Sequence, residues 1–217
     1  MLSFAEEIYL LALDNTTGKV YNYSDEISLS YALVGAILCE LSFVGKIDAD
    51  IENIIVIDKI PTGNKILDSI LNVIAEEGTK KPTSYWLKAL LHHANKVQKL
   101  VLSELVNKRI LKIVDKKIFW KFYIKRNHII NNEEVSTLET RIRELVLNEK
   151  EIPAPREAAL IGLIQACHLF ETILSPRESL RAKKRIENLA KLDMIGREVV
   201  NMISKIKNSS LRIFHND

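Results

Sequence analysis

The 217-residue sequence has little cysteine, glycine or proline, with two, seven and five residues respectively. The two cysteines, Cys39 and Cys167, lie far apart within apolar segments of helical pattern, so we expect buried thiols in a reducing compartment rather than a disulfide. The glycines are scattered, and none belongs to a GxGxxG or Walker-type phosphate loop. The usual nucleotide-binding classes are therefore not predicted.

The sequence predicts neither a targeting segment nor a membrane span. The N-terminal apolar stretch carries Glu6 and Glu7 where a signal peptide has lysine or arginine. The longest apolar run, residues 32–44, is short for a bilayer and contains Glu40 and Ser42. We expect a cytoplasmic protein whose contact with a membrane is peripheral.

Patterns of catalytic and metal-binding residues are absent as well. His92 and His93 are adjacent, so on a helix they diverge and do not share a metal as an i, i+4 pair does. No nucleophile-elbow sequence occurs. The paired acids are interpreted as helix-end charges on solvated faces; these pairs are Glu6-Glu7, Glu76-Glu77 and Glu133-Glu134. The sequence predicts no enzyme activity, no cofactor and no metal site.

What is present is the composition of a globular protein, with 47% hydrophobic and 27% charged residues. The length favours one domain over residues 1–217. Ser3 and Glu6 have capping-box spacing at the start of a first helix. Apolar spacing and Pro or Gly punctuation predict helices at 3–13, 27–44, 65–77, 84–108 (with a break near 92–95), 134–147, 155–174, 178–192 and 196–207. We expect a mainly α fold, a helical-bundle core with one or two small β-hairpins.

Two segments favour strands. The isoleucine-rich segment 51–60 reads as a strand ended by a turn at 61–64. Residues 110–114 and 117–124 read as the arms of a hairpin, with Asp115 and Lys116 near its turn. The second arm alternates apolar residues with aromatic and basic ones.

Charge is concentrated at this hairpin. Between Lys108 and Arg126 there are eight basic residues and one acid, so the segment carries +7 while the whole chain carries +3. An ordinary amphipathic strand explains the apolar face but not Phe119 and Tyr123 among lysines. Aromatic rings beside cations suit the headgroup layer of an acidic bilayer. The same chemistry also suits stacking on bases and contact with phosphates.

The order and spacing of five blocks resemble the Golgi phosphoprotein 3 family over residues 2–206. The blocks are LSFAEEIYLLALD (2–14), LVGAILCELSFVGKI (33–47), PTGNKILDSIL (61–71), ELVNKRIL (104–111) and PREAALIGLIQACHLFETILS (155–175). The resemblance implies an all-helical core with small hairpins and no catalysis. It also implies a basic pocket for a phosphoinositide headgroup such as phosphatidylinositol 4-phosphate, a hairpin tip that dips into the bilayer, and an adaptor role toward tails of membrane proteins.

Carried over by residue, the resemblance puts the family's pocket tryptophan at Tyr23 and its first pocket arginine at Val34. The two arginines of the long helix fall at Asn95 and Gln98, with Lys96 and Lys99 one position further along. The implied membrane-dipping hairpin has its tip at Ile118, Phe119 and Trp120, with Lys116, Lys117 and Lys121 beside it. Amides can hydrogen-bond a phosphate but bring no charge. The substituted pocket and the missing basic N-terminal arm favour a bacterial-type member.

Two other readings remain open. The helices at 65–77 and 84–108 followed by a basic hairpin imitate a winged helix that binds nucleic acid, although the helix for the groove offers lysines and no arginine. Alternatively, the hairpin or the strand at 51–57 pairs with another chain at an exposed edge, which includes self-association.

Overall fold

The computed structural model describes residues 2–14, 17–20, 26–49, 53–78, 80–119 and 122–213, with side chains placed outside 115–119, 122–126 and 206–213. The elements in chain order are α1 (Phe4–Leu11), α2 (Glu26–Phe43), β1 (Ile47–Ala49), β2 (Ile54–Val56), α3 (Lys65–Glu77), α4 (Thr83–Ala89), a 3-10 turn (Leu91–His93), α5 (Ala94–Asn107), β3 (Leu111–Phe119), β4 (Phe122–Ile129), α6 (Asn132–Leu147), α7 (Pro155–Ala166), α8 (Phe170–Ile173), α9 (Pro176–Leu189) and α10 (Met194–Ile213). Both sheets in this part of the chain are antiparallel pairs of strands. The prediction of a mainly α fold with small hairpins is confirmed.

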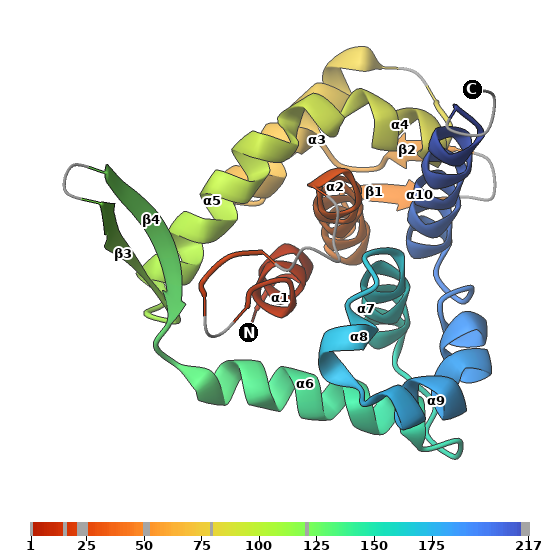
Figure 1. The fold of residues 1–217 in the computed structure, drawn as a ribbon. Helices are drawn as coiled ribbons and strands as arrows, with labels where there is room; N and C mark the ends of the chain where they lie inside the picture. The colour runs from red at the N-terminus through yellow and green to blue at the C-terminus, as the bar shows by residue number, and fades with distance from the viewer. Residues whose placement is uncertain are drawn as a thin grey trace.

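Helix α2 lies at the centre, with α1, α5, α7 and α10 packed around it (Figure 1). It is long and apolar enough to cross a membrane, yet 67% of its 18 residues are buried inside the fold. The prediction that no segment reaches this length is wrong, because the helix begins at Glu26, ahead of the apolar run. Burial on nearly all sides is typical of the core helix of a globular protein.

Glycines set the closest helix crossings of this core. A Cβ on Gly35 of α2 would lie 2.6 Å from Val199 Cγ2 on α10, and one on Gly162 of α7 would lie 3.1 Å from the Cα of Gly196 on α10. Side chains at these positions would push the helices apart. Helices α7 and α10 therefore pack backbone to backbone at Gly162 and Gly196, while Gly35 leaves room on α2 for the side chain of Val199.

Several predicted boundaries are confirmed and others shift. The break expected near 92–95 is the 3-10 turn between α4 and α5. Helix α3 matches 65–77, with Asn64 capping its first turn and Gly78 in the left-handed conformation at its end. The single helix predicted at 155–174 is instead two helices, because His168 adopts a φ of 57° between α7 and α8.

The isoleucine-rich segment forms a shorter strand than predicted. Strand β2 pairs with β1, with Ile47 opposite Val56 and Ala49 opposite Ile54. The backbone N–H of Ile54 also donates to the carbonyl of Lys81 at 2.8 Å. This contact occupies one position on the outer edge of β2, and pairing of this segment with another chain stays a prediction.

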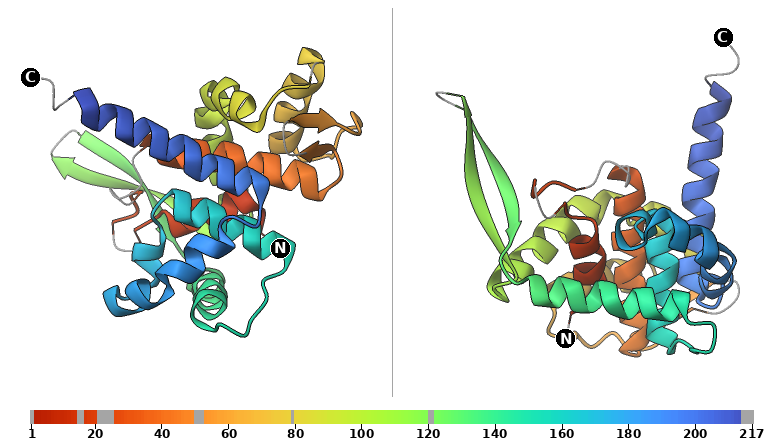
Figure 2. Two further views of the ribbon diagram at one scale, coloured as in Figure 1. Left: turned by 90° about the vertical axis from the view of Figure 1, so that its right-hand side faces the viewer. Right: turned by 60° about the horizontal axis from the view of Figure 1, so that its bottom comes forward.

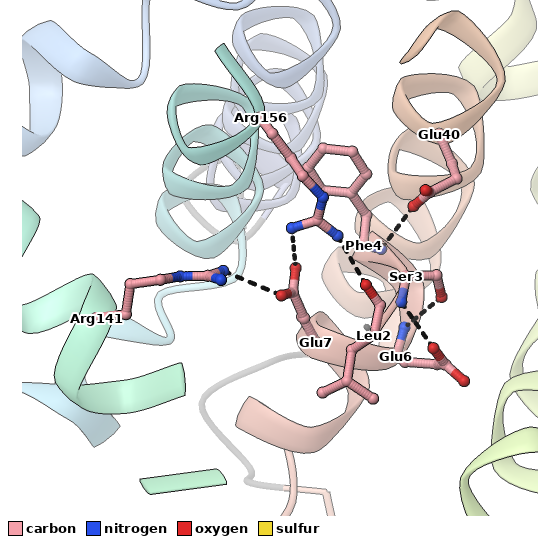
Figure 3. A network of polar contacts seen from close by, with 8 residues as sticks. All are labelled: Leu2, Ser3, Phe4, Glu6, Glu7, Glu40, Arg141 and Arg156. Atoms are coloured by element: carbon pink, nitrogen blue, oxygen red, sulfur yellow. Dashed lines mark hydrogen bonds and ion pairs between the residues drawn. The ribbon is translucent and has the colours of Figure 1, made fainter. Parts of the chain in front are cut away.

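The first turn of α1 carries a buried pair of acids. Glu6 and Glu7 are 2% and 3% exposed, so their interpretation as solvated helix-end charges is wrong, whereas Glu76, Glu77, Glu133 and Glu134 are exposed as expected. Glu7 accepts from Arg141 Nη2 at 3.0 Å and from Arg156 Nη1 at 2.8 Å (Figure 3). Burial raises the pKa of Glu7, and the two arginines oppose that rise.

Further contacts tie the same turn to its surroundings. Glu6 accepts from the backbone N–H of Ser3 at 2.7 Å, which confirms the predicted capping box. Glu6 also pairs with Lys108 just after α5, with 2.6 Å between Oε1 and Nζ. The backbone N–H of Phe4 donates to Glu40 on α2 at 2.9 Å (Figure 3). The N-terminal turn is thus bonded to α2, to the end of α5, to α6 and to α7.

Both cysteines are buried, as predicted. Burial, followed by the neighbouring Asp193 carboxylate, raises the pKa of the Cys39 thiol well above its ordinary value. Because the thiolate is the reactive species, we expect neither cysteine to react with a thiol reagent such as DTNB in the native protein. Two thiols per chain should react in 6 M guanidinium, which acts as the control. Rapid titration of a thiol under native conditions would contradict the buried positions.

Replacing Glu7 by glutamine should lower the free energy of unfolding by about 2–3 kcal/mol at pH 7, because two arginines lose their shared carboxylate. Urea unfolding followed by circular dichroism measures this change. Glu76→Gln makes the same chemical change at an exposed acid and should have little effect. Equal stabilities of the two variants would show that the buried network does not stabilise the fold.

Candidate functional site

Helix α5 carries four of the residues that the sequence places at an anion-binding pocket. Its core-facing side is formed by Val97, Val101 and Leu105, which are buried at intervals of four residues. Asn95, Lys96 and Lys99 are exposed away from that side. These three side chains are accessible to a ligand from solvent.

Gln98 lies differently, because it is half-buried and contacts the core. Its side chain hydrogen-bonds the hydroxyl of Tyr9 on α1, a contact that lowers the pKa of Tyr9 against the larger, raising effect of burial. The Nδ2 of Asn127 on β4 also donates to this hydroxyl, at 3.0 Å. Gln98 therefore joins α5 to α1 and the base of the hairpin, and its amide is already engaged within the fold.

The loop after α1 is hydrogen-bonded to Asn127 as well. The backbone N–H of Asn127 donates to the carbonyl of Gly18 at 3.3 Å. Gly18 has a φ of +64°, and a Cβ on it would lie 2.4 Å from the carbonyl oxygen of Asn127. The loop leads on to Tyr23, which lies outside the described residues. The segment before Tyr23 is thus held beside the residues that contact Gln98.

The hairpin is longer than predicted. Strands β3 and β4 pair from Leu111 opposite Ile129 to Phe119 opposite Phe122, with an irregularity between Lys117 and Phe119. The prediction of a turn at Asp115 and Lys116 is wrong, since both lie within β3, opposite Lys125 and Ile124. Asp115 is of a type that favours turns, but the strand pairing continues past it to Phe119 opposite Phe122.

The residues expected at the tip lie at the far end of the hairpin. Ile118 and Phe119 are the last two residues of β3, and Lys116 and Lys117 precede them in the same strand. Trp120 and Lys121 lie outside the described residues. The hairpin extends away from the helical body (Figures 1 and 2). At its base, Lys112, Ile113 and Val114 are exposed.

Several cationic side chains lie on or just after α5, but not all of them are free to contact an anionic ligand. Partial burial and the nearby His92 and Lys96 lower the pKa of His93. Within the described residues no carboxylate pairs with Lys96 or Lys99. Lys108, by contrast, is neutralised by the buried Glu6. The accessible cationic segment therefore begins at Arg109 rather than at Lys108.

One further position of the predicted pocket lies in the core. Val34 is 1% exposed in the core, so it does not line a surface pocket. Among the described residues no three His, Cys, Asp or Glu side chains gather as metal ligands. Sequence reasoning missed Tyr9 and Asn127, because a helix tyrosine and a strand asparagine carry no pattern that predicts their hydrogen bond across 118 positions.

Gly18→Ala should destabilise the protein by at least about 2 kcal/mol, because the left-handed backbone and the contact with Asn127 both oppose a Cβ. Gly63 has a φ of +82° with open space around it, so Gly63→Ala tests the backbone effect alone, at about 1 kcal/mol. Urea unfolding measures both changes. Hydrogen exchange should also accelerate near Asn127 in the Gly18 variant, and equal behaviour of the two variants would contradict the docking contact.

The chain was compared with known families and proteins. The family model described as Golgi phosphoprotein 3 (GPP34) matches residues 4–206, from the first residue of α1 into α10. Comparison with curated protein sequences finds no match. The match covers nearly the whole chain. The chain belongs to the Golgi phosphoprotein 3 (GPP34) family.

Proposed function

We propose that this protein is a non-enzymatic peripheral membrane protein that binds acidic lipid headgroups on the cytoplasmic side, folding as one domain over residues 1–217. The observation that carries the proposal is the β3–β4 hairpin, which projects from the body; from Arg109, just before β3, to Arg126 the chain carries seven basic residues and one acid. A surface of this charge attracts an acidic bilayer, with each nearby Lys or Arg contributing about 1 kcal/mol.

The end of the hairpin adds apolar character to this charge. Ile118 and Phe119 are the last two residues of β3, and Trp120 follows them in the sequence. A two-stranded hairpin without a covering layer is marginally stable in water. Partial insertion of its end into the headgroup layer would bury these side chains while the lysines of the strands contact phosphates.

The surroundings of α5 favour general attraction over recognition of one headgroup. Gln98 is engaged with Tyr9, and Val34 is in the core. Asn95, Lys96 and Lys99 are the exposed members of the predicted pocket and offer one amide and two cations. We infer that a phosphoinositide such as phosphatidylinositol 4-phosphate binds here as one of several anionic lipids, with Tyr23 as a further contact.

An adaptor role follows from the same proposal. A protein held at the membrane by one hairpin leaves most of its helical surface available to the tail of a membrane protein. Nucleic acid remains the second candidate, because the cations that attract phosphates of lipids also attract those of a duplex. The test below includes both ligands.

Co-sedimentation with vesicles of phosphatidylcholine, alone or with phosphatidylserine or phosphatidylinositol 4-phosphate, tests the proposal. We expect binding to both acidic mixtures at low salt and weak binding to phosphatidylcholine alone. Phe119→Ala/Trp120→Ala should weaken binding about tenfold, because two inserted rings are lost.

The matched control is Ile57→Ala/Ile60→Ala, which removes two exposed apolar side chains near β2. This control should bind as the unmodified protein does. Failure to bind acidic vesicles at low salt, or equal binding by the hairpin variant, would overturn the proposal. A salt-dependent mobility shift on duplex DNA without vesicle binding would establish the second candidate instead.

A further inference from the structure

The C-terminal part of α10 leaves the helical body on the same side as the β3–β4 hairpin. In both views of Figure 2, the far end of the hairpin and the C-terminal end of α10 extend in the same direction. The β1–β2 sheet lies toward the opposite side in the left view of Figure 2. Two elements that are distant in sequence therefore face the same space beyond the body.

The buried residues described on α10 lie in its N-terminal half, up to Ile203. Ile195, Val199, Met202 and Ile203 are buried, and the helix packs against α7, α2 and α4. Ser204 and Lys205 are exposed, while α10 continues to Ile213. A helical extension of this length is marginal in water without a surface to pack on.

The composition of the extension matches that of the hairpin. Residues 204–213 read SKIKNSSLRI, with three basic residues, no acid and three large apolar residues. A basic helix with interspersed large apolar residues is typical of segments that lie in the interface of an acidic membrane. Hairpin and helix extension thus present the same combination of cations and apolar side chains.

We propose that residues 204–213 of α10 form a second lipid-contacting element, which meets the same acidic membrane surface as the hairpin. This inference rests on the proposed function of the hairpin and adds a site to it. Two contacts at separate points restrict how the body is oriented on the membrane. They also combine two weak attachments, which is the usual requirement for stable peripheral binding.

Charge favours a lipid surface over a second copy of the chain as the occupant. Pairing two α10 extensions would bring three cations from each copy together without an acid on either. Like charges across a helix pair repel, whereas anionic headgroups complement them. The acidic lipid surface is therefore the occupant that the sequence of the extension fits.

Lys207→Glu/Arg212→Glu should lower partitioning onto vesicles with phosphatidylserine by about tenfold to a hundredfold, because two attractive charges become repulsive. Lys59→Glu/Lys65→Glu makes the same charge change at exposed positions near β2 and at the start of α3. This matched control should change partitioning less than threefold. Co-sedimentation at fixed lipid composition gives both values, and circular dichroism verifies that both variants are folded.

A probe reports the contact directly. Both native cysteines are buried, so a Ser210→Cys variant can be labelled with an NBD fluorophore at that position alone. The emission of this label should shift to the blue on acidic vesicles. The same label on Lys59→Cys should not shift. Light scattering without lipid should give the same oligomeric state for the unmodified chain and for a chain ending at Lys205.

The outcomes separate the two proposals. If the unmodified protein does not bind acidic vesicles, the proposed function itself fails. If it binds while Lys207→Glu/Arg212→Glu partitions equally well and the Ser210 label does not shift, the second contact alone is overturned. Self-association that disappears when the chain ends at Lys205 would also overturn it, in favour of a second copy.

Discussion

The arrangement of the helices depends on two carboxylates buried in the first turn of α1. Glu6 and Glu7 are desolvated, so each needs a cation and hydrogen-bond donors to offset the cost of burial. The donors come from segments far apart in the sequence, namely Lys108, Arg141 and Arg156. Pairing these two carboxylates therefore requires α6, α7 and the end of α5 to take fixed positions around α1. Helix α2 is joined to the same turn through Glu40 (Figure 3).

A second buried polar group links this arrangement to the hairpin. The hydroxyl of Tyr9, one turn beyond Glu6, is shared by Gln98 and Asn127. Because Asn127 also bonds the loop at Gly18, one cluster holds α1, α5, the loop and the base of β4 together. This explains how a hairpin with little packing of its own has a defined direction. It also gives Gln98 a structural role, because its side chain joins α5 to α1.

Charge is divided between the body and its projections. The cations of the core, such as Arg156 and Lys108, are paired with buried acids. The cations of the hairpin and of the end of α10 stand in segments with almost no acids. The chain belongs to the Golgi phosphoprotein 3 (GPP34) family, and this distribution of charge is the basis of the proposal that its projections meet a lipid surface.

The sequence by itself determined the helical class, the position of most helices, the capping box at Ser3 and the basic hairpin, because all depend on local spacing. Tertiary structure decided which polar residues are buried: Glu7 appeared solvated, and Tyr9 and Asn127 carried no signal. It also decided the position of the hairpin turn and the extent of α2. The physical reason is that burial, pairing and register depend on distant segments, which local periodicity does not encode.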